Sequence, residues 1–367
     1  MHIAIFGAGI AGLMNAIALQ SHGHECALYE RSRLSHDLGM GFILMPEAVA
    51  RMEQLGIQLA GDCGGIPLDR YVCRDSHGKV LYQEAMPRGS RSIRRRELIR
   101  TLVDAANLHN TVHFDAELDH LEFDENGRTL AAVLNSGERI TADLFVAADG
   151  AHSRIRRALF PHWSTKRARV VNVVGLVCCP TATVWAGHSF NKFHAASGGL
   201  AVGVLPVDSD HVVWFMQFDS YRFHPPGNQD VAREEWSEFV LRMAGTWAFP
   251  VPSLLATTPS CNMHVWSPLD IDLVPAFHHN NVILAGDAAH PLSPFTSQGV
   301  ASAVADAVTL ANVLPATNDT KLLEKAVDLY SKQRQQQCAG HLSMGRELSQ
   351  RFVAPVSSRS FRLPMAT

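Results

Sequence analysis

The chain lacks a dominant charge, a long apolar run and a regular cysteine pattern. Its 367 residues carry a net charge of −3, which indicates neither nucleic acid nor an anionic membrane as a partner. No apolar stretch approaches the ~18 residues that a membrane-spanning helix requires, so we expect no stable membrane insertion. The 7 cysteines are odd in number and include no Cys-x-x-Cys spacing. This argues against a disulfide framework and favours the cytoplasm.

Several chemical motifs are also missing. Despite 19 histidines, there is no His-Glu-x-x-His and no paired Cys/His spacing, so no metal site is expected. The sequence also contains no Gly-x-Ser-x-Gly motif, which would indicate a covalent serine nucleophile. Cys178 and Cys179 lie in an apolar run, and we interpret them as buried strand residues rather than redox partners. The chain is 47% hydrophobic and long enough to form two domains.

The most informative motif is a glycine pattern at the start of the chain. An apolar strand over residues 2–6 runs into Gly7-x-Gly9-x-x-Gly12, and a helical pattern follows at once. A second apolar strand ends in Glu30, whose carboxylate suits a ribose diol. Gly7 permits the tight turn, Gly9 lets the backbone approach a pyrophosphate, and Gly12 lets helix and strand pack closely. The pattern predicts a dinucleotide-binding βαβ unit, with no targeting segment before residue 2.

The rest of the chain shows two kinds of pattern. Continuous apolar runs at 144–148 and 282–285 predict buried strands, and apolar residues at helical spacing predict helices over 299–314 and 321–350. Residues 170–223 are instead β-rich and aromatic, with strand-like alternation through 212–218 and without a βαβ rhythm. We therefore predict an α/β fold with a Rossmann-like dinucleotide-binding domain, an inserted β-sheet substrate domain and C-terminal helices.

The predicted domain boundaries follow these changes in pattern. The dinucleotide-binding domain takes residues 1–70, 94–170 and 265–320. The substrate domain takes residues 71–93 and 171–264, and a C-terminal helix and tail take 321–367.

Two later strands end in an acid beside a glycine. The run 144–148 leads into Asp149-Gly150, and the run 282–285 leads into Gly286-Asp287. In an open α/β sheet, ligands bind beyond the carboxyl ends of the strands, so both acids are placed to meet one dinucleotide. Each acid taken alone is equally well interpreted as a cap on the following helix.

With these motifs in this order, the chain resembles the single-component (class A) flavoprotein monooxygenases of the para-hydroxybenzoate hydroxylase type. The resemblance covers most of residues 1–350. The sequence shows no thioredoxin-like C-terminal domain, and in this respect it resembles the short, salicylate hydroxylase-like branch of the family. The matching residues are the glycine pattern with Glu30, then Asp149, Gly150, Ser153 and Arg156, then Gly286, Asp287, Gln298 and Gly299.

The resemblance implies a tightly held, non-covalent FAD. It places Glu30 at the adenosine ribose with Arg31 nearby, Arg95 at the flavin or its phosphates, and Asp287 at the pyrophosphate. A helix opening at Gln298 would direct N–H groups and its dipole at the flavin, which favours the reduced, anionic form. The implied cofactor-binding residues are Gly7, Gly9, Ala11, Gly12, Glu30, Arg31, Arg95, Asp149, Gly286, Asp287, Gln298, Gly299 and Val300.

Two positions depart from the family pattern. Ser297 stands where many members carry a glycine, so the backbone near the flavin is expected to differ in shape. Phe295 stands where urate-hydroxylating relatives place an acid after the proline. This departure argues against a urate-like substrate and predicts an apolar wall.

The resemblance also implies the reaction. There is no second Gly-x-Gly-x-x-Gly for a separate nicotinamide domain, so NAD(P)H is expected to dock transiently and reduce the flavin. The reduced flavin would react with O₂ to give a C4a-hydroperoxide that hydroxylates a small aromatic or polyketide-like substrate. The expected partners are that substrate and O₂, with the protein a monomer or a homodimer.

Candidates for the substrate site lie on the inserted sheet and near Pro294. A base near a phenolic hydroxyl would favour hydroxylation, and His194, Gln217 and Tyr221 are the candidates, although each is also typical of an ordinary polar sheet residue. Strand alternation puts Trp214 and Met216 on the face opposite Phe215 and Gln217, and which face lines the pocket stays open. The predicted pocket walls are Met45, Trp214, Met216, Pro294 and Phe295.

Two other functions compete with this prediction. An FAD-dependent oxidase, dehydrogenase or reductase would use the same fold. A binding or chaperone module that has kept only the scaffold is a third possibility. The presence of Glu30, Arg95, Asp149 and Asp287 argues against that last alternative.

Overall fold

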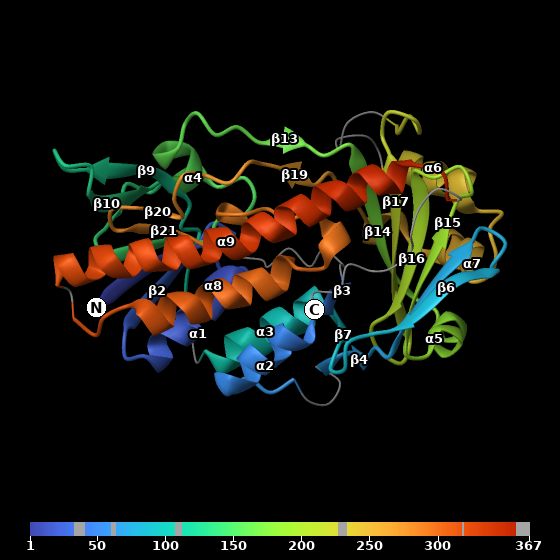
Figure 1. Ribbon diagram of the computed structural model, residues 1–367, viewed down its shortest axis with the longest axis horizontal. Helices are drawn as coiled ribbons and strands as arrows, with labels where there is room; N and C mark the ends of the chain where they lie inside the picture. The colour runs from blue at the N-terminus through green and yellow to red at the C-terminus, as the bar shows by residue number, and fades with distance from the viewer. Residues whose placement is uncertain (33–40, 60–63, 107–111, 227–232, 318, 357–367) are drawn as a thin grey trace.

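Strands from distant parts of the chain form a six-stranded sheet in one half of the molecule (Figure 1). The computed structural model describes residues 1–32, 41–59, 64–106, 112–226, 233–317 and 319–356. Five of the six strands are parallel, and only the edge strand β20 is antiparallel to its neighbour. The strand order is β20 (His278–His279), β21 (Val282–Leu284), β12 (Leu144–Ala147), β1 (His2–Phe6), β2 (Glu25–Glu30) and β8 (Val112–Phe114).

The strand order brings the three sequence motifs to one edge of this sheet. The last residues of β1, β12 and β21 lie in register with one another. Gly7, Asp149 and Gly286 each follow within 2 residues of these strand ends. The carboxyl edge of a parallel sheet is where such folds bind nucleotides, so the predicted α/β architecture is confirmed and its motifs converge.

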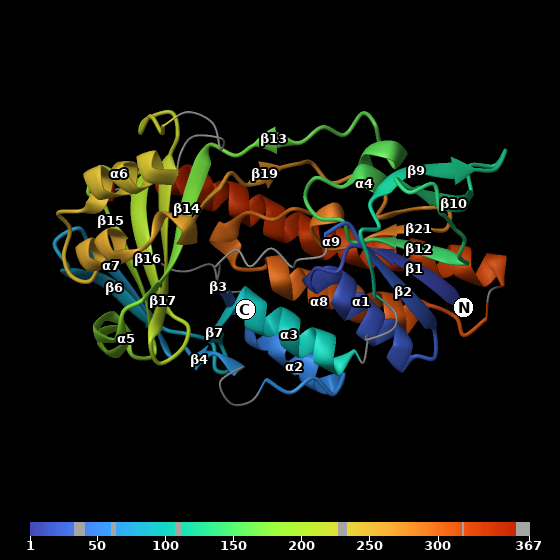
Figure 2. The same cartoon turned by 180° about the vertical axis from the view of Figure 1, so that it is seen from behind.

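Helices cover this sheet and connect it to the other half. Helix α1 (Ile10–Ser21) packs against α8 (Gly299–Val313), and α8 packs against α9 (Thr320–Val353). Helix α9 begins at Asp319, whose side chain accepts hydrogen bonds from the N–H groups of Lys321 and Leu322, each at 3.0 Å. It runs along the molecule from the first sheet toward the second (Figures 1 and 2).

Smaller elements complete the first half. Three short helices lie between its strands: α2 (Pro46–Gln54), α3 (Arg95–Ala105) and α4 (Arg154–Leu159). Two three-stranded antiparallel sheets accompany them: β3 (Gly41–Leu44), β7 (Arg91–Arg94) and β4 (Ile66–Pro67); and β11 (Arg139–Ile140), β10 (Thr129–Leu134) and β9 (Leu118–Phe123). A two-stranded pair, β13 (Lys166–Arg167) with β19 (Leu269–Asp270), leads toward the second half.

A seven-stranded sheet forms the second half. Residues 70–85 join it from an earlier part of the chain, through a parallel pairing between Arg70–Asp75 and Ser189–His194. Its strand order is β18 (Met263–Trp266), β14 (Val170–Cys178), β17 (His211–Asp219), β16 (Leu200–Pro206), β15 (Ser189–His194), β5 (Arg70–Asp75) and β6 (Val80–Ala85).

The structure corrects our interpretation of Cys178 and Cys179. Cys178 is the exposed last residue of β14, and Cys179 is only partly buried. The strand ends there because Pro180 has no N–H to donate to a neighbouring strand. Pro180 instead begins helix α5 (Pro180–Ala186), which alternation in the sequence did not reveal.

The two faces of the second sheet have different surroundings. One face packs against α6 (Arg233–Ala244) and α7 (Val251–Thr257) in an apolar cluster that includes Trp214, Met216 and Phe218. The other face contributes Phe190 and Val213 to the main core shared with the first half. Within the part of the chain that the structure describes, no helix is both long and apolar enough to cross a bilayer.

Two glycines allow close backbone packing at the end of β1, Gly7 against the chain after β12 and Gly12 in α1 against the turn after β1. Gly7 has φ +103°, and a Cβ there would lie 2.3 Å from the carbonyl oxygen of Ala148. A Cβ on Gly12 would lie 1.8 Å from the carbonyl oxygen of Gly7. Backbone atoms cannot move aside as flexible side chains do, so only glycine fits at both positions.

Gly12→Ala is expected to destabilise the protein by about 1–3 kcal/mol or more, since the new methyl group overlaps backbone. Gly340→Ala in α9 is the matched control, because a Cβ there meets nothing within 4 Å. Alanine should add about 0.5–1 kcal/mol of helix stability at that site. Thermal unfolding followed by circular dichroism measures both, and equal effects of the two variants would contradict the close-approach argument.

Candidate active site

Glu30, at the end of β2, fixes the glycine turn. Its side chain accepts hydrogen bonds from the N–H of Ala8 at 2.8 Å and from the N–H of Ser32 at 3.1 Å. These contacts hold the carboxylate beside the turn where a dinucleotide ribose is expected. Arg31 is exposed next to it, and Ala11 lies half-buried in the first turn of α1.

The two carboxylate oxygens of Asp149 have different surroundings. Its Oδ2 accepts hydrogen bonds from the N–H groups of Arg154 at 2.8 Å and Ile155 at 3.4 Å, at the start of α4. The capping interpretation therefore holds for this oxygen. Its Oδ1 is buried without a hydrogen-bond partner among the described residues. Buried acceptors are rarely left in this state, so Oδ1 suits a donor from a ligand.

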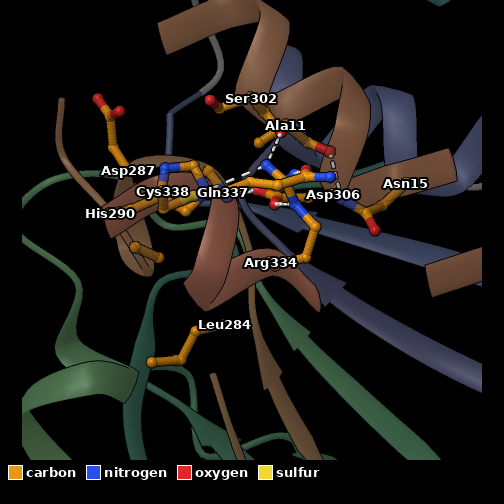
Figure 3. A network of polar contacts seen from close by, with 12 residues as sticks. Ala11, Asn15, Leu284, Asp287, His290, Ser302, Asp306, Arg334, Gln337 and Cys338 are labelled. Carbon is orange, nitrogen blue, oxygen red and sulfur yellow. Dashed lines mark hydrogen bonds and ion pairs between the residues drawn. The ribbon is translucent and has the colours of Figure 1, made fainter. Parts of the chain in front are cut away.

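Asp287 differs from Asp149 because its side chain is exposed. It points away from the neighbouring polar cluster in Figure 3. Although solvent reaches this carboxyl, the dense protein around it reduces its solvation and raises the pKa of Asp287, while the charges of His290, Arg95 and Arg156 act in the opposite direction. Burial likewise lowers the pKa of Arg95, and Asp287 opposes that shift. The charges of Asp287 and Arg95 therefore act on each other.

Arg156 connects the two acid–glycine loops. Its side chain is 1% exposed and donates hydrogen bonds to the carbonyl oxygens of Asp287 at 3.1 Å, Ala288 at 2.8 Å and Ala151 at 2.6 Å. Because these carbonyls belong to loops that follow different strands, the guanidinium sets the spacing between them. We interpret Arg156 as a positioning residue.

A buried polar cluster holds the Gly286-Asp287 loop from the other side (Figure 3). Asp306 in α8 accepts three hydrogen bonds: from the Gly286 N–H at 2.7 Å, from His290 Nε2 at 2.7 Å and from Arg334 Nε at 2.6 Å. Arg334 comes from α9 and also donates to the carbonyl oxygen of Ser302 at 3.1 Å and to Gln337. Asp306 is 0% exposed.

The charges in this cluster depend on one another. Burial alone would raise the pKa of Asp306, but the charges of His290 and Arg334 hold it at about 2. Burial alone would lower the pKa of His290, but Asp306 raises it well above the usual value. A buried carboxylate between two cations is therefore ionised, and removing that carboxylate leaves two buried cations uncompensated.

The N-terminus of α8 is open. Gln298 caps it without a side-chain hydrogen bond, and no acidic residue occupies the first turn. Ser297, just before it, has φ +54° in the left-handed region, which explains why a glycine suits this position. Gln298 is buried, and Gly299 and Val300 are half-buried. The first N–H groups of a helix have no acceptor within the helix, so together with the helix dipole they favour an anionic group at this end.

The structure places His194 and Gln217 in one row of the second sheet. His194 pairs with Ala201, and Ala201 pairs with Gln217, so the side chains of these residues lie on the same face. Both candidates are buried. Tyr221 lies beyond the end of β17, is 75% exposed and stacks against Arg169, so the structure does not bring it into this row.

The predicted walls Trp214 and Met216 lie on the opposite face, which corrects that expectation. They pack against α6 and α7, and Trp214 Nε1 donates a hydrogen bond to Thr258 Oγ1 at 2.8 Å. Successive side chains of a strand point to opposite faces of the sheet, so β17 directs Phe215 and Gln217 away from α6 and α7. Met45 is buried at the start of α2 within the main core.

Phe295 lies beside residues that sequence reasoning missed. It follows Pro294 in a short 3-10 turn, and its ring centroid is 5.3 Å from that of Phe352 near the end of α9. Lys192 Nζ lies 5.3 Å from the Phe295 ring centroid and donates to Gln217 Oε1 at 2.6 Å. The buried Asn172 was detectable as a lone polar residue in an apolar strand, whereas Lys192 lies among other polar residues of β15 and nothing local marked Phe352 or Asp306.

Comparisons with known proteins agree with this geometry. The chain matches the family described as FAD binding domain over residues 1–342. An FAD-dependent urate hydroxylase of Klebsiella pneumoniae subsp. pneumoniae is 30% identical over 351 residues, covering 91% of this chain and 86% of the relative. Aurachin C monooxygenase/isomerase of Stigmatella aurantiaca is 25% identical over 322 residues, covering 85% and 80%.

A solved structure is similar throughout. The crystal structure of Klebsiella pneumoniae HpxO complexed with FAD and uric acid superposes with a TM-score of 0.81 at 26% identity, covering 95% of this chain and 87% of that one. The fold and the site thus define an FAD-dependent flavoprotein of the class A monooxygenase type. The chain belongs to the FAD-binding-domain family, together with FAD-dependent hydroxylases and monooxygenases.

Asp306→Asn is expected to destabilise the protein by about 3–5 kcal/mol, because it leaves two buried cations uncompensated. The folded-state pKa of Asp306 lies near 2, below its ordinary value of 3.8. Its contribution is therefore fully present above about pH 4 and is lost as the pH falls toward 2. The difference in thermal midpoint between wild type and variant should shrink over that range.

The exposed pair of Arg139 with Glu122 supplies the control. Arg139→Met should leave the thermal midpoint nearly unchanged, since exposed pairs contribute little. A difference between wild type and Asp306→Asn that stays constant from pH 5 to pH 2 would contradict the assignment.

Proposed function

We propose that this protein is an NAD(P)H-dependent monooxygenase that hydroxylates a small aromatic molecule. The balanced reaction converts substrate, O₂, NAD(P)H and a proton into hydroxylated product, water and NAD(P)⁺. The observation that carries this proposal is the arrangement of the FAD-family motifs at one sheet edge. It is supported by the aromatic and polar residues at the end of α9 and on the second sheet.

The residues present fit FAD. Glu30 would hold the adenosine ribose, Arg95 and Asp287 the flavin–pyrophosphate region, and the unpartnered Oδ1 of Asp149 would accept a hydrogen bond from the same ligand. The open N-terminus of α8 would stabilise negative charge on a reduced isoalloxazine. When bound, FAD supplies the hydride-accepting and O₂-activating chemistry that side chains lack.

The protein's own contribution is to position the substrate and exclude water. The half-buried Phe295 packs on the buried Phe352 near the second sheet, and this apolar contact suits a planar apolar body and limits water access. His194 is the proposed proton acceptor for a substrate hydroxyl, because it is buried in the same row as Gln217. We assign no proton transfer to the exposed Tyr221.

The nature of Phe295 favours a substrate other than urate. One relative is an FAD-dependent urate hydroxylase, and the family resemblance implies an acid after the proline in urate-hydroxylating members, where this chain has Phe295. A phenyl ring cannot accept the hydrogen bonds that a urate ring offers, so an apolar aromatic ring fits better.

Arg95→Met is expected to weaken FAD binding by about tenfold or more, because it removes a cation that lies near Gly9 of the glycine turn and whose charge acts on Asp287. Arg96→Met is the matched control, since Arg96 is the next residue and its side chain is exposed. The dissociation constant follows from the recovery of FAD fluorescence on dilution. Equal FAD retention by both variants would remove Arg95 from the proposed contacts.

The purified protein should be yellow, and a suitable aromatic compound should accelerate its oxidation of NADPH or NADH. With ¹⁸O₂, mass spectrometry should find one labelled oxygen in the product. Unlabelled product with continued nicotinamide oxidation would instead favour the oxidase, dehydrogenase or reductase alternative. A protein that takes up no FAD would contradict the whole proposal.

A further inference from the structure

Three polar side chains lie together on the face of the second sheet that is turned away from α6 and α7. Lys192 is in β15, Gln217 in β17 and Asn172 in β14. Asn172 is the direct strand partner of Gln217, and Lys192 Nζ donates a hydrogen bond to Gln217 Oε1 at 2.6 Å. Asn172 and Gln217 are neighbours through this direct pairing, whereas Lys192 pairs with Gly203 and reaches Gln217 through its hydrogen bond. We call these three groups on one face of the sheet the polar row.

Asn172 has an unsatisfied donor in this row. Its side chain is 2% exposed, and its Nδ2 has no hydrogen-bond partner among the described residues. The side chain is flanked along β14 by Val170 and Val174, which face the same way. Leaving a buried amide without an acceptor costs free energy, so an acceptor supplied by a ligand would be strongly favoured.

Aromatic rings surround the charged end of the row. Lys192 Nζ lies 5.3 Å from the ring centroid of Phe295, 5.7 Å from that of Phe352 and 5.8 Å from that of Phe215. Rings at these distances attract the ammonium group and also exclude water from it. With less water, the ammonium group attracts an anion more strongly than it would at an open surface.

We propose that Lys192 and Asn172 form a subsite for a carboxylate, which makes this chain selective for aromatic acids. Lys192 supplies the charge, Asn172 Nδ2 donates a hydrogen bond, and the rings of Phe295 and Phe352 contact the aromatic body. The assignment of this ligand as a substrate rests on the proposed function. The subsite itself rests on the contacts of these side chains.

The test measures binding without turnover. Isothermal titration calorimetry on the FAD-loaded protein compares benzoate, salicylate and anthranilate with their neutral carboxamides. At least one carboxylate should bind about tenfold or more tightly than its own amide, because a charge-assisted hydrogen bond is lost in the amide. If no acid binds more tightly than its amide, the proposal is overturned.

Variants assign the preference to these residues. Lys192→Met removes the charge but keeps the length of the side chain, so it should reduce the ratio of acid affinity to amide affinity to about one. Lys192→Arg keeps the charge and should retain the preference. Lys79→Met is the control, because Lys79 is exposed in the turn before β6 of the same sheet. A Lys192→Met protein that still prefers acids would overturn the proposal.

Asn172→Leu separates binding from a structural role. Because the variant removes an unsatisfied buried amide, its thermal midpoint should stay equal or rise, while carboxylate affinity falls several-fold. A lowered midpoint with unchanged affinity would contradict the role of Asn172. If acids bind selectively but ¹⁸O₂ yields no labelled product, the proposed function fails and the carboxylate subsite stands.

Discussion

The hydrogen bond from the Gly286 N–H to Asp306 is the interaction on which the site depends most. The same carboxylate binds His290 and Arg334, so one buried side chain joins the loop after β21 to both α8 and α9. Figure 3 shows how these elements meet there. Gly286 also packs closely on α1, since a Cβ at that position would lie 2.6 Å from Ala11 Cβ. The position of Asp287 follows from these contacts.

The second constraint is the difference between the two faces of the seven-stranded sheet. Large apolar side chains such as Trp214 fill the face under α6 and α7, and a Cβ on Gly175 would lie 2.4 Å from that indole. The opposite face carries the polar row, and α9 reaches it through Phe352, whose carbonyl oxygen accepts the Gly199 N–H at 2.8 Å. Helix α9 therefore contributes both to the nucleotide edge, through Arg334, and to the proposed substrate face.

Sequence patterns predicted the structural elements well where a residue type or spacing is compatible with only one local structure. The glycine pattern located the turn before α1, and strand alternation correctly separated Trp214 from Gln217. Alternation could not say which face adjoins the cofactor site, because that depends on what each face packs against. The cap on α4 by Asp149 was one of two open interpretations, and only the hydrogen bonds show that one oxygen caps while the other is unpartnered.

The sequence by itself determined the α/β class, the close approach of α1 to β1 and the set of acids at the strand ends. These depend on steric limits and periodicities that neighbouring residues encode. Only the tertiary structure decided that Asp306 holds the Gly286 loop and that Lys192, Gln217 and Asn172 form one row. Those groups come from separate helices or strands, so their meeting depends on strand order, register and the docking of α9, which no local pattern specifies.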